Sequence, residues 1–404
     1  MKGLKLHWQI FIALILAVLF GIFFKDHIGY VAWMGEIFLR ALKMIIIPLI
    51  FSSIVSGVTN FGNAENIGRL GLKTITYYIS TSTLAIITGL ILVNIFKPGI
   101  GADLNLSQSI DLGIESDTLG RTLIKIIPEN IFSAFSSNGQ MLSVIFFAML
   151  FGFFITRAKY QYQESLKVFF NGLFDVMMKV TLFIIKFTPY GIFGLVAEKV
   201  AQQDDLPALM QSMGLYMAVV SMSLAIHSMI TLPLLLKGIG KVNPIKHLKS
   251  MQTPLLTAFS TSSSSATLPL TIHAVENNSG VSNKISSFTL PLGATINMDG
   301  TALYECIAVI FIAQAYSVDL SIVQQIIVVI TALLASIGAA GIPMAGLVMI
   351  TIVLTAVGLP LEGVGLILAV DRILDMFRTT VNVWSDSCGA VIIAKLEGEK
   401  LKVE

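Results

Sequence analysis

The sequence predicts an all-α membrane protein that crosses the bilayer many times. Of its 404 residues, 55% are hydrophobic and only 12% are charged, whereas a soluble domain is about 25% charged. So few charges could not cover the surface of a soluble fold of this size, and so much apolar sequence excludes a disordered chain. The net charge of +2 is too small to favour nucleic acid, so no nucleic-acid partner is expected.

Six apolar runs in the first part of the chain are each expected to cross the hydrocarbon core, which takes roughly 20 residues. They cover residues 8–24, 33–58, 74–96, 141–155, 166–196 and 206–236. The polar stretch 97–138 between them is expected to form a loop with short helices. Lysines and arginines precede the first run and follow the second, fourth and sixth, which predicts that both termini are cytoplasmic.

Two later apolar segments, 246–274 and 323–358, are interrupted by a serine-rich run at 260–269 and a Gly/Pro-rich run at 338–346. Backbone groups freed there need partners in protein or water. We therefore expect two re-entrant helical hairpins with tips at these runs; the alternative is one kinked spanning helix in each place. An apolar helix with a polar break, 286–314 or 363–395, follows each hairpin. This repeated order indicates inverted repeats, as in many secondary transporters.

The last apolar helix carries ionisable groups that are costly inside a membrane and are usually functional. Together with the polar Asn382 they are Asp371, Asp375, Arg378 and Asp386, and the five residues are spaced by four, three, four and four positions. At about 100° per residue, this spacing places all five on one helix face roughly 80° wide. We name these five residues the polar stripe.

Arg378 offers a planar fork of donors suited to a carboxylate, and Asp375 could receive an ammonium group. Together they would recognise an acidic amino acid such as aspartate or glutamate. The alternative is an internal ion pair that neutralises itself. Thr379 borders the stripe, whereas Arg372 is expected to lie outside it.

Hard oxygen ligands gather in the same part of the chain: Asn297, Asp299, Asn382 and Asp386, with Gly300 allowing the helix to unwind. Oxygen ligands with few cysteines or histidines suit an alkali cation better than a transition metal. The alternative role for Asp299 is a helix cap.

Three further features leave alternatives open. Glu305, in an apolar run, is either a proton carrier or a permanently hydrogen-bonded carboxyl. The polar run 77–83 would ordinarily join helices to one another. Cys306 and Cys388 are expected to be packing thiols.

These motifs resemble the dicarboxylate/amino acid:cation symporter family, the glutamate/aspartate transporters related to excitatory amino acid transporters. The matching sequences are the serine-rich tip 262–269, the run 289–302, the tripeptide 341–343 and the polar stripe, in the same order and spacing over 246–395. The resemblance implies eight transmembrane helices plus two re-entrant hairpins, a homotrimer, and an elevator-type motion of a transport domain against a scaffold. It assigns 1–73 and 98–200 to the scaffold, and 74–97 and 201–404 to the transport domain.

The resemblance also implies the site residues, with Na⁺ as the coupling ion and no organic cofactor. The substrate would be bound by Arg378, Asp375, Thr379, Asn382, Thr301, Ser263, Ser264, Ser265, Gly341, Ile342, Pro343 and Gly346. The cations would be bound by Asn297, Met298, Asp299, Asn382, Asp386, Tyr78, Thr81, Ser82, Ser336 and Ile337. Glu305 would carry the proton.

This chain departs from the family pattern at several positions. Glu305 stands where sodium-driven archaeal members commonly have glutamine, which favours a proton role. Retention of Asp386, where proton-driven bacterial members often have asparagine, favours sodium. Ser262 and Met376 occupy the two positions where a second arginine is usual, and Arg372 could supply that charge. Ser385, where glycine is common, and Trp384 could alter the neighbouring sodium site.

The sequence thus predicts a symporter that imports acidic amino acids with Na⁺, with H⁺ as a candidate second ion, in a prokaryotic inner membrane. A carrier of neutral amino acids is disfavoured by Arg378, and a carrier of C4-dicarboxylates by Asp375. An ion channel is the alternative from another class, since polar re-entrant loops also form filters. An enzyme is not expected, because no histidine or lysine accompanies the serine-rich run.

Overall fold

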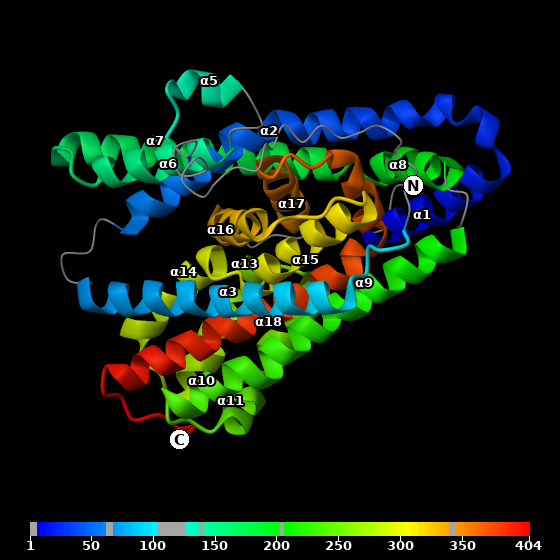
Figure 1. Cartoon of the computed structure of the whole chain (residues 1–404). Helices are drawn as coiled ribbons and strands as arrows, with labels where there is room; N and C mark the ends of the chain where they lie inside the picture. Colours follow the sequence, from blue (N-terminus) through cyan, green and yellow to red (C-terminus); the bar gives the residue numbers. More distant parts are fainter. Residues whose placement is uncertain (1–5, 62–67, 103–126, 137–140, 203–205, 339–344) are drawn as a thin grey trace.

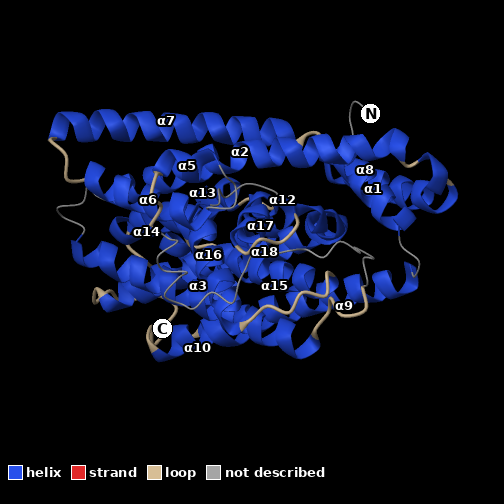
Figure 2. Cartoon of the chain, turned by 45° about the horizontal axis from the view of Figure 1, so that its top comes forward, coloured by secondary structure: helices blue, strands red, loops and turns tan. Residues whose placement is uncertain are grey.

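The computed structural model describes residues 6–61, 68–102, 127–136, 141–202, 206–338 and 345–404. Within these ranges the chain forms helices and no strands (Figures 1 and 2). The all-α prediction is confirmed.

The first half of the chain consists of long apolar helices. They are α1 (Leu6–Phe23), α2 (Gly29–Phe61), α3 (Gly68–Phe96), the short α5 (Ile131–Ser136), α6 (Met141–Ile155), α7 (Tyr160–Ile185) and α8 (Thr188–Gln202). The single span predicted over 166–196 is wrong, because α7 ends and α8 restarts at Thr188. Pro189, the second residue of α8, explains the break because it has no backbone N–H to donate to the carbonyl of Ile185.

The second half is divided into shorter helices. They are α9 (Leu206–Ile226), the π-helix η3 (His227–Thr231), α10 (Leu232–Gly238), α11 (Pro244–Ser250), α12 (Gln252–Thr261), α13 (Ser264–Ala274), the π-helix η4 (Val275–Ser279), α14 (Asn283–Ile296), α15 (Asp299–Ala315), α16 (Ile322–Gly338), α17 (Ala345–Ala356) and α18 (Val364–Leu396).

The serine-rich run forms a tight turn between two helices that pack against each other, α12 and α13. Ser262 ends α12 in the left-handed conformation (φ 51°), and the Ser263 hydroxyl caps α13 by accepting from the backbone N–H of Ala266 at 3.2 Å. Helices α16 and α17 also pack against each other. Gly341, Ile342 and Pro343, in the segment that joins them, lie outside the described residues.

Of the two predicted polar breaks, one forms and one does not. The backbone leaves the helix at Asn297 and Met298, between α14 and α15. The predicted break in 363–395 is wrong, since α18 runs as one helix of 33 residues. No glycine or proline lies between residues 378 and 388, so the backbone has no reason to leave the helix while the polar side chains find partners on other helices.

Helix α15 lies at the centre of the molecule (Figure 1). All its residues except Gln314 are buried. It contacts α3, α9, α16, α17 and α18, while α2 packs against α6, α7 and α8.

A hydrogen bond also joins α3 to the residue that follows α18. Lys73 of α3 donates to Glu397, and this hydrogen bond lowers the pKa of the Glu397 carboxyl.

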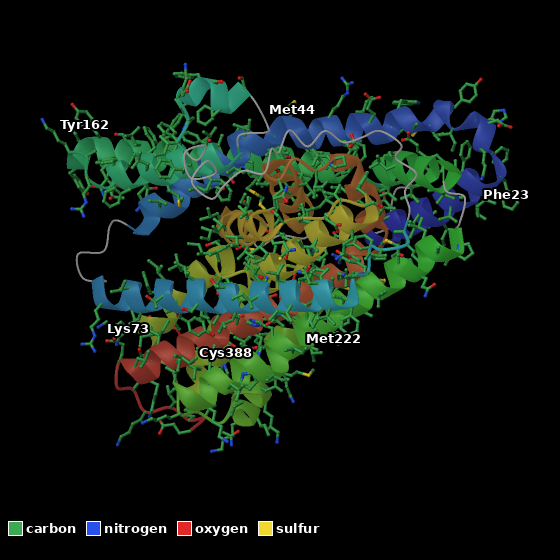
Figure 3. The ribbon with its side chains drawn as sticks, in the orientation of Figure 1. Phe23, Met44, Lys73, Tyr162, Met222 and Cys388 are labelled. Carbon is green, nitrogen blue, oxygen red and sulfur yellow. The ribbon has the colours of Figure 1, made fainter. Side chains whose placement is uncertain are left out.

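The outer surface is apolar where a soluble protein would be polar. Phe23, Met44 and Tyr162 are 72%, 67% and 55% exposed and point outward (Figure 3). In the part of the chain that the structure describes, five helical stretches are long and apolar enough to cross a membrane: Gly29–Thr59, Arg69–Phe96, Tyr160–Ile185, Pro207–Gly238 and Asn283–Ala315. Both observations agree with a multi-pass membrane protein.

Helices α2 and α8 approach each other closely through glycines, as small residues allow in membrane proteins. A Cβ atom added to Gly194 would lie 2.5 Å from the backbone nitrogen of Gly35 and 2.8 Å from the carbonyl oxygen of Val31. The contact is with backbone, so it cannot be relieved by turning a side chain.

We therefore expect Gly194→Ala to destabilise the fold by about 1–3 kcal/mol, the usual cost of overpacking. The measurement is the Tm of the purified protein in detergent. Gly172→Ala is the matched control, because a Cβ at Gly172 of α7 would meet nothing within 4 Å. A Tm for Gly194→Ala as high as that of the control would contradict this prediction.

Candidate functional site

The polar stripe lies along a buried face of α18. Asp371, Asp375, Arg378, Asn382 and Asp386 are each at most 5% exposed. The helix packs against α12, α14 and α15. Polar groups from α3, η3, α15 and the end of α14 join the stripe in two clusters, one around Arg378 and one around Asp299.

The first cluster surrounds the Arg378 guanidinium, which is 1% exposed. Its Nη2 atom lies 2.7 Å from Oδ1 of Asp375 and 3.2 Å from Oδ1 of Asp371. Its Cζ atom lies 3.8 Å from the ring centroid of Tyr304, a cation–π contact. The buried Nε and Nη1 atoms have no hydrogen-bond partner among the described residues. The internal ion pair therefore forms, but it uses only one of the three guanidinium nitrogens.

The carboxylates beside Arg378 have further partners. Oδ1 of Asp371 accepts from the hydroxyl of Tyr304 at 2.6 Å. Oδ2 of Asp375 lies 3.5 Å from Nη1 of Arg372. Arg372 is 22% exposed, unlike the buried stripe residues, and its side chain brings a second positive charge to Asp375.

Among the described residues of the two helix pairs, Gly346 is the one expected substrate-site residue with a close approach to Arg378. A Cβ atom at Gly346, at the start of α17, would lie 2.6 Å from Nη1 of Arg378, so only glycine lets the backbone come this close. In the serine-rich turn, Ser263 and Ser264 are buried and Ser265 is exposed. Thr379 is buried on α18.

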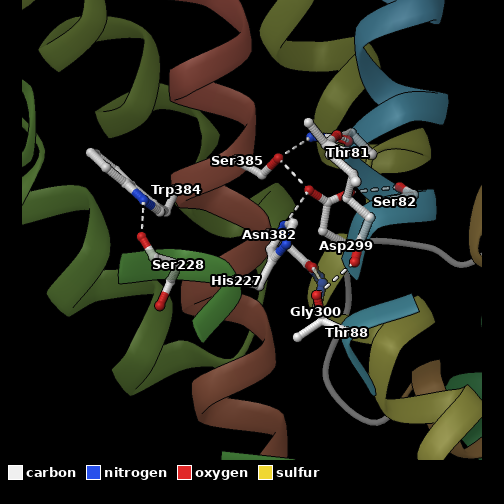
Figure 4. A network of polar contacts seen from close by, with 12 residues as sticks. Thr81, Ser82, Thr88, His227, Ser228, Asp299, Gly300, Asn382, Trp384 and Ser385 are labelled. Carbon is white, nitrogen blue, oxygen red and sulfur yellow. Dashed lines mark hydrogen bonds and ion pairs between the residues drawn. The ribbon is translucent and has the colours of Figure 1, made fainter. Parts of the chain in front are cut away.

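The second cluster surrounds the carboxylate of Asp299, the first residue of α15 (Figure 4). Its Oδ1 atom accepts from Ser82 of α3 at 2.6 Å. Its Oδ2 atom accepts from Ser385 at 2.6 Å and lies 3.1 Å from Nε2 of His227. Asp299 thus joins three other elements, and these contacts are not those of a helix cap.

Asn297 connects Asp299 to Asp386 on α18. Its Nδ2 atom donates to Oδ1 of Asp386 at 2.9 Å and to the Ser385 hydroxyl at 3.0 Å. Its Oδ1 atom lies 3.3 Å from the Thr81 hydroxyl. Tyr78 is close by, since a Cβ atom at Gly293 would lie 2.8 Å from its hydroxyl and 2.5 Å from Oδ1 of Asp386.

Asn382 lies between the two clusters on α18. Its Oδ1 atom accepts from the backbone N–H of Gly300 at 2.8 Å, and its Nδ2 atom donates to the Thr301 hydroxyl at 3.1 Å. The start of α15 is thereby tied to the stripe.

Other residues expected at the site are less closely connected. The carbonyl of Met298 accepts from Ala302 N–H within α15, and the Ser336 hydroxyl donates to the Leu333 carbonyl at 2.8 Å. Among the described residues, no hydrogen bond joins Ser336 or Ile337 to the Asp299 cluster. Glu305 is fully buried, and neither carboxyl oxygen has a partner in the described part of the chain.

The sequence interpretation overlooked His227. It lies in the π-helix η3 and is fully buried against Asp299. Trp384 supports the same element by donating from Nε1 to the Ser228 carbonyl at 3.1 Å (Figure 4). The signal in the sequence was a histidine inside the apolar run 206–236. The structure adds that this histidine begins a π-helix, a feature often found at functional sites. Cys306 and Cys388 are buried free thiols, as expected.

The whole described chain resembles known transporters. Residues 6–396 match the family model described as the sodium:dicarboxylate symporter family. The chain is 38% identical to excitatory amino acid transporter 3 of Mus musculus, over 99% of this chain and 88% of the relative. It is 37% identical to the proton/sodium-glutamate symport protein of Bacillus caldotenax, over 99% and 96%, and 36% identical to the proton/glutamate-aspartate symporter of Escherichia coli (strain K12), over 98% and 94%.

The contact between Tyr304 and Asp371 predicts a measurable contribution to stability. We expect Tyr304→Phe, which keeps the ring over Arg378 but removes the donor to Asp371, to cost about 1.5–3 kcal/mol, the range for hydrogen bonds to charged groups. Tyr304→Leu, which also removes the aromatic face, should lower the Tm further. An unchanged Tm for Tyr304→Phe in ligand-free protein would rule out this contribution.

Proposed function

Because the chain belongs to the sodium:dicarboxylate symporter family, we propose that it imports L-glutamate or L-aspartate together with Na⁺, with H⁺ as a second coupling ion. The transported amino acid binds at the Arg378 cluster and the sodium ions bind around Asp299 and Asp386. The observation that carries this proposal is the buried guanidinium of Arg378, with two donor nitrogens directed at no acceptor among the described residues.

A buried donor without a partner costs free energy, so a site that keeps two of them is best explained by a ligand that fills them. Nε and Nη1 lie on opposite sides of the guanidinium, so each could donate separately to an incoming anionic group, and a carboxylate is a strong acceptor for such a donor. In this proposal, the side-chain carboxylate of an acidic amino acid accepts from the unpaired guanidinium nitrogens, and Asp375, 2.7 Å from Nη2, receives its amino group.

The cation part of the proposal rests on the oxygen atoms around Asp299. One hydrogen-bonded network contains carboxylate, amide and hydroxyl oxygens from Asp299, Asn297, Asp386, Thr81 and Ser82. Among the described residues, no group of three or more His, Cys, Asp or Glu side chains forms a cluster of the kind that holds a metal ion. Such hard ligands suit Na⁺. Co-transport supplies the driving force, since one charge crossing 100 mV provides about 2.3 kcal/mol.

Glu305 is the proposed proton site. A fully buried carboxyl without a hydrogen-bond partner is accommodated most easily in its neutral form. Opening of the site to water would let the proton leave, so uptake and release of H⁺ would accompany transport.

The overall mechanism is proposed from the family. Residues 74–97 and 201–404 would move as a transport domain in an elevator motion against a scaffold of 1–73 and 98–200, within a homotrimer in a prokaryotic inner membrane. The helix pairs α12–α13 and α16–α17 would be the two re-entrant hairpins, added to eight transmembrane helices with both termini cytoplasmic. The direct contacts of α3 with α9, α15 and α18 support its assignment to the moving part.

A C4-dicarboxylate is the second candidate substrate, and a specific observation favours it. Asp375 already faces two guanidinium groups, Arg378 and Arg372, which reduces the negative charge available for an ammonium group. Competition separates the candidates: excess succinate should leave aspartate uptake unaffected if Asp375 receives the amino group.

The decisive experiment uses the full chain in proteoliposomes. Radiolabelled aspartate and glutamate uptake is measured under separate Na⁺, H⁺ and K⁺ gradients. Saturable uptake that requires inward Na⁺ supports the proposal and excludes a channel. Uptake that is absent for both amino acids under every gradient would refute it.

Exchange of the guanidinium fork tests the substrate site. We expect Arg378→Lys, which keeps the positive charge but loses the planar pair of donors, to weaken aspartate or glutamate binding at least about 30-fold, or about 2 kcal/mol. Binding is measured by calorimetry at saturating Na⁺. Arg40→Lys is the matched control, because Arg40 forms an exposed ion pair with Glu36 at 2.6 Å. Undiminished affinity in Arg378→Lys would remove Arg378 from the substrate site.

Neutralisation of Glu305 tests the proton site. We expect Glu305→Gln to abolish the pH dependence of uptake while retaining the sodium dependence. Glutamine has nearly the same size and shape as glutamate, but it cannot bind or release a proton in this pH range. Uptake is measured across pH 5–8 at constant Na⁺, with Glu276→Gln as control, because Glu276 is hydrogen-bonded to Asn283 at 2.9 Å. A mutant pH profile that coincides with the parental profile would contradict a proton role.

A further inference from the structure

Ser385 occupies a central place among the proposed cation ligands. It is fully buried on α18, next to Asp386. Its hydroxyl donates to Oδ2 of Asp299 at 2.6 Å and accepts from Nδ2 of Asn297 at 3.0 Å. Ser385 was not among the residues proposed above to bind substrate or cation.

These contacts form one continuous chain of hydrogen bonds between two carboxylates. It runs from Asp299 through the Ser385 hydroxyl to the Asn297 amide, whose second N–H reaches Oδ1 of Asp386 at 2.9 Å. The directions are fixed along this path, because an ionised carboxylate only accepts and the amide nitrogen only donates. The Ser385 hydroxyl must therefore direct its single hydrogen to Asp299.

The same hydroxyl limits how the Asp299 carboxylate can turn. Ser82 holds Oδ1 from α3, and Ser385 together with His227 holds Oδ2 from α18 and η3. With Oδ2 occupied, the carboxylate keeps Oδ1 on the side of Ser82. A ligand held in this way loses less freedom when a cation binds.

We propose that Ser385 is a positioning residue of the cation site, which holds Asp299 and Asn297 in the geometry that binds Na⁺ and couples the Asp299 position to the Asp386 position. This inference rests on the proposed sodium coupling and deepens it. Ser385 acts through its two neighbours and is not itself required as a ligand.

Coupling follows from the shared amide of Asn297. A cation near Asp386 competes for the carboxylate oxygen that now accepts from Nδ2 of Asn297. Any rotation of the Asn297 amide changes the hydrogen bond that Nδ2 donates to the Ser385 hydroxyl. Because that hydroxyl donates to Asp299, the position of the Asp299 carboxylate changes as well. Loss of the hydroxyl should therefore weaken sodium binding and make its concentration dependence less steep.

The test uses the purified full chain with Ser385→Ala and Ser385→Gly. The Tm is measured against NaCl concentration without amino acid, with choline chloride keeping the ionic strength constant, because a ligand that binds the folded state raises the Tm. Aspartate or glutamate binding is then measured against Na⁺ concentration and at saturating Na⁺. Ser387→Ala is the matched control: Ser387 is buried two residues along the same helix, but its hydroxyl donates to the Trp384 carbonyl at 2.8 Å.

Both Ser385 variants are expected to need about tenfold more Na⁺ for half-maximal stabilisation, the loss of one hydrogen bond to a charged group. Their dependence on Na⁺ should be shallower, and substrate affinity at saturating Na⁺ should stay at the parental value. Ser387→Ala should retain the parental sodium curve.

Three results would overturn the proposal for Ser385. They are a parental sodium curve in both Ser385 variants, tighter sodium binding in either, and an equal loss in Ser387→Ala, which would indicate a general loss of packing. A parental chain stabilised by NaCl that binds neither amino acid would instead refute the proposed substrate while leaving the Ser385 comparison decisive.

Discussion

The structure is organised around one buried positive charge, the Arg378 guanidinium. A charge removed from water requires partners, and removal of one partner from a buried pair leaves the other uncompensated. Two carboxylates, Asp371 and Asp375, and the face of Tyr304 surround this one. The helices that carry these groups, α15 and α18, must remain packed against each other. The same requirement keeps the backbone of α17 against the guanidinium at Gly346.

The continuous helix α18 gives the Arg378 cluster and the Asp299 cluster a fixed separation. Arg378, Asn382 and Asp386 follow one another on a single face, so the clusters are held by helix geometry and not by a flexible loop. The complementary groups come from the place where the backbone leaves the helix between α14 and α15. Asn297 and Asp299 lie at this break, and the N–H of Gly300, which has no partner within the helix, donates to Asn382.

Much of this arrangement was predictable from the sequence because it depends on local geometry. The spacing of the polar stripe fixed its shared face, and the serine-rich run 260–269 indicated the turn that ends α12. Contacts made at a distance were not predictable. The contact of the Asn297 amide with Asp386 joins residues that are 89 positions apart in the sequence. His227 was overlooked because its partner, Asp299, is 72 residues away in the sequence. The prediction of a break in α18 was wrong. Polar side chains alone do not interrupt a helix when their hydrogen-bond partners lie on neighbouring helices.

The hydrogen bonds of Asn382 suggest how the two clusters influence each other. Its amide oxygen accepts from Gly300 and its amide nitrogen donates to Thr301, so it holds the start of α15 from the side of Arg378. Asp299, at the start of the same helix, is held from the other cluster through Ser82 and Ser385. A ligand that moves either set of contacts must move the first turn of α15 or strain it. Because α15 is buried along its length, strain is costly there, and occupation of one cluster should favour the matching geometry of the other.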